Sequence, residues 1–227
     1  MSRWYAIPPE NYLEMMRDWK THMIIAPHLL NSKTYQDFYI TNAENLHCLL
    51  DNGLWEGYVV SNSKLLKMAD YCLAEEIIAP DHVSGAITAG RTKRFIEYLK
   101  QNGQRNNFKI HGAVHGSKFS EARKCLLELV KFGVDIISMP KMLGQKWRLC
   151  FAEYIQEKHP EIPVHYLGYY KEELPLLEKT NNLVRSFDTS VPFKPRYGEK
   201  FDLHLPYTLR NRIIISSRVS KWKKLYK

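Results

Sequence analysis

Residues 76–116, EIIAPDHVSGAITAGRTKRFIEYLKQNGQRNNFKIHGAVHG, contain the clearest strand and helix signals in the chain. Residues 76–81 form a short apolar run that ends in Asp81, which is typical of a buried strand. Residues 89–102 carry apolar side chains at helical spacing, and a glycine follows as a stop signal. Residues 109–116 are predicted to form the next strand and the loop that follows it. The stretch therefore predicts one strand, one helix and a second, parallel strand.

The same alternation extends in both directions along the chain. Upstream strands are predicted at 23–27 and 46–50, and downstream strands at 134–139, 164–168, 183–188 and 213–215. Helices are predicted from a Ser120 cap to Gly133, over 147–157 and over 172–179, with a basic helix after the last strand. Repeated βα units predict a parallel sheet. We expect a single-domain (β/α)8 TIM-like barrel over 1–209, although a doubly wound open sheet would place a ligand at the same strand ends.

Composition excludes several classes of protein. The chain has 227 residues, of which 44% are apolar and 25% charged, so it can form a core and is not disordered. No apolar run reaches the roughly 18 residues that span a bilayer, and residues 1–5 lack the apolar stretch of a signal peptide. The four cysteines follow no CxxC spacing, which indicates reduced thiols and no zinc site. A cytoplasmic protein without membrane contact is expected.

The net charge of +9 is concentrated at one end. Residues 1–192 carry 23 basic and 22 acidic side chains, whereas residues 210–227 carry seven basic side chains and no acid. A basic segment with aromatic residues suits a polyanion, because lysine and arginine neutralise phosphates. A solvated tail that only aids solubility would show the same composition, and the charge alone leaves both interpretations open.

Three carboxylates, Asp51, Asp81 and Asp188, each directly follow an apolar run. A barrel brings the carboxyl ends of its strands together at one mouth. Two carboxylates facing a sugar carbon are the arrangement needed to exchange a glycosidic bond, one as nucleophile and one for proton transfer. Each aspartate alone would equally suit the cap of the next helix or turn.

Five segments resemble motifs of the guanine transglycosylases, which replace guanine in a nucleic acid with a 7-deazaguanine. They occur in the family's order over roughly residues 45–192. They are Asp51-Asn52-Gly53, Ile78-Ala79-Pro80-Asp81, Gly112-Ala113-Val114-His115-Gly116, His165-Tyr166-Leu167-Gly168 and Ser186-Phe187-Asp188-Thr189-Ser190. The resemblance implies a barrel enzyme that is a pentosyltransferase.

The departures from the family point to one branch. The tRNA enzymes carry a zinc site after the nucleophile, but this chain has no cysteine after Cys150. His115 stands at the family's glutamine position, and Ile137–Lys141 replace its glycine-rich loop. A short chain without zinc resembles the phage and bacterial DNA-modifying branch, the DpdA type. The resemblance to this branch implies that the partners are DNA and a free 7-deazaguanine base and that no cofactor is needed. It also implies that the protein is located in the host cytoplasm if the gene is phage-encoded.

The resemblance also implies roles for individual residues. Asp188 would attack C1′ of deoxyguanosine, and Asp51 would act as general acid and base. Asp81 would accept hydrogen bonds from the purine N1–H and amine, and His115 would hydrogen-bond O6, although a structural histidine fits equally well. The remaining substrate-binding candidates are Asn52 and Gly53 in the ribose pocket, the backbone of Ser138 and Met139 near the 7-substituent, and Gly168.

The target base is hidden in a duplex, so it must be flipped out or lie in a single strand. Basic residues expected to hold the phosphates are Lys118, Lys141, Arg210, Arg212, Arg218, Lys221, Lys223 and Lys224. Competing interpretations are exchange in tRNA, a non-catalytic nucleic-acid-binding barrel, and a barrel hydrolase acting on a small sugar or phosphate. The oligomeric state stays open, and a homodimer is compatible with the sequence.

Overall fold

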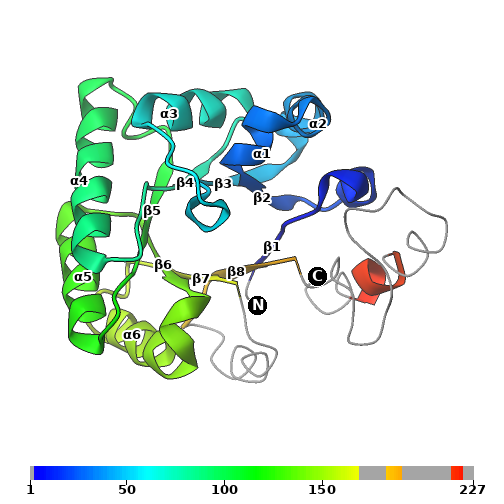
Figure 1. The fold of residues 1–227 in the computed structure, drawn as a ribbon. Coiled ribbons are helices and arrows are strands. Elements are labelled where there is room, and N and C mark those ends of the chain that lie inside the picture. Colours follow the sequence, from blue (N-terminus) through cyan, green and yellow to red (C-terminus); the bar gives the residue numbers. More distant parts are fainter. Residues whose placement is uncertain (1–2, 169–182, 191–215, 222–227) are drawn as a thin grey trace.

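The computed structural model describes residues 3–168, 183–190 and 216–221. Within these residues, eight parallel strands close into a barrel in the order β1 to β8, which confirms the predicted TIM-barrel fold (Figure 1). The strands are β1 (Arg3–Ala6), β2 (Thr21–Ile25), β3 (His47–Asp51), β4 (Glu76–Ile78), β5 (Lys109–Ala113), β6 (Ile136–Pro140), β7 (Val164–Leu167) and β8 (Ser186–Thr189).

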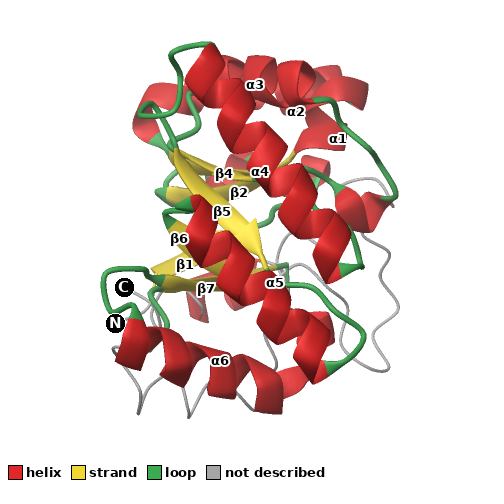
Figure 2. Ribbon diagram, turned by 90° about the vertical axis from the view of Figure 1, so that its left-hand side faces the viewer, coloured by secondary structure: helices red, strands yellow, loops and turns green. Residues whose placement is uncertain are grey.

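Helices cover the outside of the strands (Figure 2). The α-helices are α1 (Ala26–Asn31), α2 (Lys33–Asn42), α3 (Asn62–Tyr71), α4 (Gly85–Gln101), α5 (Phe119–Phe132) and α6 (Gly144–Lys158). Short 3-10 turns lie at Glu10–Tyr12, Glu14–Met16, Ala43–Asn45, Leu54–Glu56 and Lys141–Leu143. No helix in the described ranges is long and apolar enough to cross a membrane.

The strands divide the side chains between two cores because successive residues point to opposite faces. In β3, Cys48 and Leu50 join the main core under the helices, whereas Leu49 points into the barrel. The interior forms a small apolar layer of Tyr5, Met23, Ile25, Leu49, Ile78 and Ala113. This layer closes the barrel below the carboxyl ends of the strands and gives the mouth an apolar base.

Strand β1 is the one barrel strand that sequence patterning does not predict. It is four residues long and pairs with β8 in parallel, with Tyr5 opposite Asp188. The barrel closes through this pairing. The strand predicted at 213–215 and the helix predicted at 172–179 lie outside the described residues, as does the predicted domain boundary at 209.

Three predicted helix starts are wrong, including that of α6, which begins at Gly144 rather than at residue 147. Helix α4 begins at Gly85 rather than at residue 89; a Cβ at Gly85 would lie 2.4 Å from the His115 carbonyl oxygen, so only glycine fits this approach. Helix α5 begins at Phe119, which places Ser120 inside the first turn instead of at the cap. The Glu121 carboxylate accepts hydrogen bonds from the Ser117 and Gly85 N–H groups, at 2.9 and 3.0 Å, and stabilises both helix starts.

Candidate active site at the barrel mouth

The mouth of the barrel brings the three predicted carboxylates together. Asp51, Asp81 and Asp188 all line one cavity of about 560 Å³, which we call the mouth cavity. Its wall also includes His115, Trp55, Lys141 and Gly168. The apolar residues Ile7, Met23, Ile25 and Leu167 line it as well. An apolar pocket with a few convergent polar groups is the usual form of a small-molecule site.

Asp188 is held by two N–H donors on a single carboxylate oxygen. The Gly168 N–H donates to Oδ1 at 2.9 Å, and His165 Nε2 lies 3.2 Å from the same oxygen. An ionised carboxylate only accepts, so Nε2 carries the proton and Nδ1 accepts from the Ser186 hydroxyl at 2.9 Å. Oδ2 accepts no hydrogen bond from the residues that the structure describes. The arrangement therefore fixes one carboxylate oxygen with two donors and leaves the other without a donor from the described residues.

The Gly168 corner is itself fixed from outside the barrel. Gly168 has a φ of +65°, a left-handed conformation that glycine adopts without strain. Its carbonyl oxygen accepts a 2.7 Å hydrogen bond from Arg148 Nη2. The Arg148 guanidinium is fully buried and lies 3.9 Å from the centre of the Tyr166 ring. Helix α6 therefore holds the backbone group that donates to Asp188.

Asp51 lies in a different electrostatic environment. Burial raises the pKa of Asp51 well above its ordinary value, and the nearby charges of Asp81, Glu56 and Asp188 raise it further. A hydrogen bond from the Gly53 N–H opposes this only partly. Asp51 therefore keeps its proton to higher pH than an ordinary aspartate. Titratable groups with environments this different can divide acid and nucleophile roles between them.

Asp81 and His115 form a buried pair beside these two carboxylates. His115 Nε2 lies 2.7 Å from Asp81 Oδ2, and the two residues are only 3% and 6% exposed. Within the described ranges, Asp81 Oδ1 and His115 Nδ1 are buried without a hydrogen-bond partner. Buried polar atoms normally have partners, so these two atoms are positioned to meet a ligand. His115 Nδ1 is an acceptor in the neutral ring and a donor only in the imidazolium form.

Asn52 and Gly53 do not line the mouth cavity, but Asn52 lines a smaller cavity beside it, and their predicted place in a ribose pocket stays a prediction. The Asn52 amide donates to the Ala79 carbonyl at 3.0 Å, and its oxygen accepts from the Leu54 N–H at 3.1 Å. Gly53 has a φ of +82°, and a Cβ there would lie 2.4 Å from the Pro27 ring. Both residues instead shape the loop that carries Trp55 into the cavity wall.

Ser138 and Met139 do not line the mouth cavity, and their predicted backbone contact with a substrate stays a prediction. The Ser138 hydroxyl lies 2.8 Å from His111 Nδ1 inside the barrel, and its carbonyl accepts from the Val114 N–H at 2.8 Å. Met139 packs into the core under the helices. The mouth cavity is lined at this point by Pro140, Lys141 and Met142, the residues that follow.

The predicted phosphate contacts fall into three groups. Lys141 is exposed and lines the mouth cavity, and Lys118 and Lys221 are also exposed. Arg218 lies in a short helical segment at 216–221 and is only 7% exposed, which argues against its predicted phosphate contact because its side chain presents little surface. Arg210, Arg212, Lys223 and Lys224 lie outside the described residues.

A second polar group, which we call the floor cluster, occupies the opposite end of the barrel. Its centre is the fully buried Glu76, which His111 Nε2 contacts at 2.8 Å and His47 Nε2 at 3.0 Å. Arg185 reaches the same carboxylate with both terminal nitrogens, Nη1 at 3.1 Å. Burial alone would raise the pKa of Glu76, but these hydrogen bonds outweigh it and hold the pKa far below its usual range.

The sequence patterns predict no role for the floor cluster or for His165. The available signal was the placement of polar residues at inward positions of strands, including His111, Ser138, His165 and Ser186. Alternation shows which face such residues occupy, but it does not show what they contact across the barrel.

No group of three metal-ligating side chains occurs within the described part of the chain.

No protein-family model and no curated protein matches the chain. Solved structures do match its fold. The glycerol uptake operon antiterminator regulatory protein of Listeria monocytogenes aligns with a TM-score of 0.57 and 15% identity over 84% of this chain and 92% of that chain. KGPDC from Streptococcus mutans aligns with a TM-score of 0.57 and 9% identity over 100% of both chains. A 4-hydroxy-2-oxoglutarate/2-dehydro-3-deoxyphosphogluconate aldolase from TTHB1 aligns with a TM-score of 0.55 and 10% identity over 99% and 93%.

At these identities the likeness establishes a TIM barrel and does not establish an activity. The neighbours include an aldolase and a regulatory protein, so the same barrel supports different functions. None of the three is a guanine transglycosylase. The function must therefore be argued from the residues at the mouth.

Proposed function

We propose that the protein is a DNA guanine transglycosylase that exchanges guanine for a 7-deazaguanine, such as 7-cyano-7-deazaguanine, through a covalent sugar–Asp188 intermediate. The observation that carries the proposal is the pairing of two unlike carboxylates at one mouth. Asp188 is hydrogen-bonded as an anion through Oδ1 alone, whereas burial and neighbouring charges raise the pKa of Asp51. A nucleophile and a general acid require these two environments.

In the first half of the reaction, Asp188 Oδ2 attacks C1′ of the target nucleotide. The C1′–N9 bond breaks and its electron pair goes to the guanine, which takes a proton from Asp51. The products are free guanine and a sugar–Asp188 ester, with Asp51 now ionised. The N–H groups of His165 and Gly168 continue to hold Oδ1, so the ester stays in one orientation.

In the second half, the incoming 7-deazaguanine occupies the place of guanine. Its N9–H gives its proton to the Asp51 carboxylate, and N9 attacks C1′. The ester bond breaks, its electron pair returns to Asp188, and Asp51 is again protonated. The cycle needs no oxidant, reductant or metal, and the polymer backbone is never cut.

Recognition of the purine is assigned to Asp81 and His115. The buried Asp81 Oδ1 accepts from the purine N1–H and exocyclic amine, a donor pair that a carboxylate matches. His115 holds the other carboxylate oxygen at 2.7 Å and so fixes the orientation of Asp81. His115 also donates to the purine O6 when its ring is in the imidazolium form.

The assignment of DNA as the polymer has two supports in the sequence. The chain carries no cysteine after Cys150, so it lacks the zinc ligands of the tRNA enzymes that it resembles, and residues 210–227 carry seven basic side chains. The mouth itself presents three carboxylates. Backbone phosphates must therefore be held beside the mouth rather than inside it.

The test is incorporation of radiolabelled guanine and of unlabelled 7-cyano-7-deazaguanine into single-stranded DNA, duplex DNA and tRNA. We expect the wild type to label DNA, the deazapurine to displace that label, and Asp188→Asn to label nothing. A control variant, Asp70→Asn on the exposed face of α3, should retain wild-type exchange. Label only in tRNA would favour the tRNA enzyme, and binding of DNA without label would favour a non-catalytic barrel.

A further inference from the structure

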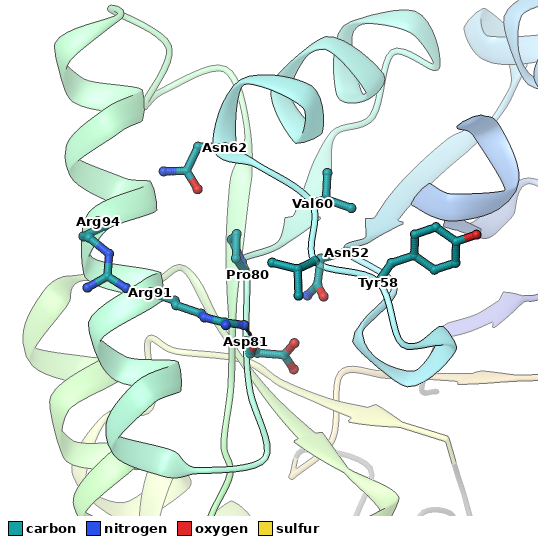
Figure 3. A pocket seen from close by; sticks show the side chains of 9 residues that line it. Asn52, Tyr58, Val60, Asn62, Pro80, Asp81, Arg91 and Arg94 are labelled. Carbon is teal, nitrogen blue, oxygen red and sulfur yellow. Dashed lines mark hydrogen bonds between the residues drawn. The ribbon is translucent and has the colours of Figure 1, made fainter. Parts of the chain in front are cut away.

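A second cavity lies beside the mouth cavity and shares Asp81 with it (Figure 3). We call it the arginine pocket; its volume is about 140 Å³. Its wall comes from the loop after β3, the start of α3, the end of β4 and helix α4. The residues that line it are Asn52, Tyr58, Val59, Val60, Asn62, Pro80, Asp81, Arg91 and Arg94.

The two arginines of α4 carry uncompensated positive charge. Arg91 Nη1 donates to the backbone carbonyl of Asp81 at 2.6 Å, and its other N–H groups have no partner among the residues that the structure describes. Neither Arg91 nor Arg94 forms an ion pair within the described part of the chain. Other arginines do: Arg105 pairs with Asp135 at 2.9 Å, and Arg185 pairs with Glu76.

The carboxyl group of Asp81 does not neutralise these arginines. Its Oδ2 is held by His115 at 2.7 Å, on the mouth side. Figure 3 shows the Asp81 carboxyl group pointing away from the helix that carries both arginines. Asn62, at the start of α3, adds an amide that makes no hydrogen bond to the described residues. The arginine pocket therefore presents donors from α4 and Asn62 to a ligand, while the Asp81 carboxyl group, whose Oδ1 has no partner among the described residues, is directed away from α4.

We propose that the arginine pocket binds a phosphate group of the polynucleotide next to the target nucleotide. Guanidinium groups match a phosphate because their planar donors can contact two oxygens at once. The pocket shares a wall with the base-recognition residue, so a strand whose base enters the mouth passes directly over it. This inference rests on the proposed function and names the surface that places the substrate.

The loop between the two cavities supports a strand lying across it. Trp55 lines the mouth cavity and is 79% exposed, and Val59 lines the arginine pocket and is 78% exposed. Large apolar side chains this exposed leave water on binding a partner. Bases stack on exposed aromatic rings in single-strand binding sites, which is the role that Trp55 takes here.

The test compares Arg94→Gln with Lys93→Gln, two neutralisations at adjacent positions of α4. Lys93 is exposed and lies 3.8 Å from Glu97, and it does not line the pocket. Binding of a fluorescent 20-nucleotide single strand is measured against salt concentration. We expect Arg94→Gln to raise Kd about tenfold at low salt and to reduce the slope of log Kd against log salt by about 1. Lys93→Gln should change both much less.

Equal increases in Kd for the two variants would overturn the proposal, because the weaker binding would then follow from the lower net charge of the protein and not from the loss of a contact in the arginine pocket. An intermediate Kd for Arg94→Lys is expected, since lysine keeps the charge without the planar donors. Ribose 5-phosphate and inorganic phosphate separate the possible sources of the phosphate. Millimolar binding of either compound that Arg94→Gln abolishes, with oligonucleotide affinity unchanged, would assign the pocket to a small phosphate compound instead.

The binding measurement does not depend on catalysis, so it distinguishes this inference from the proposed function. If the wild type exchanges no base but Arg94→Gln still weakens oligonucleotide binding selectively, the exchange activity fails and the phosphate site stands. If the wild type exchanges guanine and Arg94→Gln binds and reacts normally, the phosphate site fails and the activity stands.

Discussion

The two ends of the barrel use the same kinds of side chain in opposite ways. At the floor, the Glu76 carboxylate is contacted by His47, His111 and Arg185. At the mouth, Asp81 Oδ1 is buried without a partner in the described residues, and Asp51 has a raised pKa. At the floor the Glu76 carboxylate has hydrogen-bond partners on both oxygens, whereas at the mouth Asp81 Oδ1 has none among the described residues. Unsatisfied groups of this kind mark a functional site, because a core alone would not retain them.

The histidines at the two ends make the contrast sharper. His111 and His165 each place Nδ1 within 2.9 Å of a serine hydroxyl on the next strand. They differ in the carboxylate that Nε2 meets, which is Glu76 at the floor for His111 and Asp188 at the mouth for His165. The same arrangement of residues therefore contacts Glu76 at the floor and, at the mouth, Asp188, the proposed nucleophile.

Asp51→Asn should separate activity from stability at the mouth. We expect base exchange to fall by about 10²–10⁴-fold, because the amide cannot transfer the proton. The pKa of Asp51 is raised on folding, so the wild type loses stability as the pH rises above the ordinary aspartate value of 3.8. The variant should therefore melt at a higher temperature than the wild type at pH 8, and the difference should vanish near pH 4.

Calorimetry and the exchange assay measure both effects, with the exposed Asp37→Asn in α2 as the control. A variant that melts lower than the wild type at pH 8 would show that the Asp51 carboxylate is compensated in the folded protein.

Glu76→Gln should be the most destabilising change at the floor. It removes the negative charge that balances Arg185, and breaking a buried pair in this way costs about 3–5 kcal/mol. For a chain of this size the melting temperature should fall by roughly 6–20 °C. The neighbouring Glu75→Gln, whose side chain is 46% exposed, is the matched control and should shift the melting temperature much less. Similar losses in both variants would contradict a stabilising role specific to the floor cluster.

His165→Ala and His111→Ala compare the two ends through equivalent histidines. His165→Ala should lower kcat about tenfold to a hundredfold with little change in KM, because Asp188 loses a donor and its orientation. His165→Gln should recover part of the rate, since its amide can donate to Oδ1. His111→Ala should instead lower the melting temperature and leave kcat per folded molecule unchanged. Equal losses of kcat in the two alanine variants would contradict the distinction between a positioning role for His165 and a stabilising role for His111.

His47 gives the smallest effect, and it depends on pH. Hydrogen bonds to Glu75 and Glu76 raise the pKa of His47 from 6.5 to about 9. A histidine with a raised pKa contributes stability that is complete below pH 6.5 and is lost as the pH rises through about 9. We expect His47→Gln to cost about 1–2 kcal/mol at pH 6, or roughly 2–8 °C in melting temperature, and much less at pH 10. Thermal melts at the two pH values check this, and a loss independent of pH would show that His47 acts through packing.

The sequence predicts the barrel well, because the apolar residues of each βα unit show strand or helix spacing within a short segment of the chain. Strands β2 to β8 all fall on predicted runs, and Asp51, Asp81 and Asp188 lie at one mouth as expected. The short β1 has no such pattern, because its four residues are a strand only through pairing with β2 and β8. The pattern of residues within a short segment does not show which distant strand that segment will pair with.

The details of the site were less predictable, for the same reason. The resemblance implied a backbone contact of Ser138 and Met139 with the substrate but not the side-chain positions, and strand alternation turns the first side chain toward His111 and the second toward the helices. Asn52 was expected in a ribose pocket; its amide donates to the Ala79 carbonyl, and the residue lines the arginine pocket rather than the mouth cavity. Contacts across the barrel decide these roles, and they depend on register between strands far apart in sequence.

The pairing of Tyr5 with Asp188 has a consequence for how the protein is made. The proposed nucleophile lies on the seam where the earliest strand of the barrel meets the latest. During synthesis from the N-terminus, β1 emerges long before its partner β8, and it must wait with one edge unpaired. The strand pairing that carries the proposed nucleophile therefore forms last. A chain that has not yet reached β8 can contain the other seven strands and still lack this carboxylate.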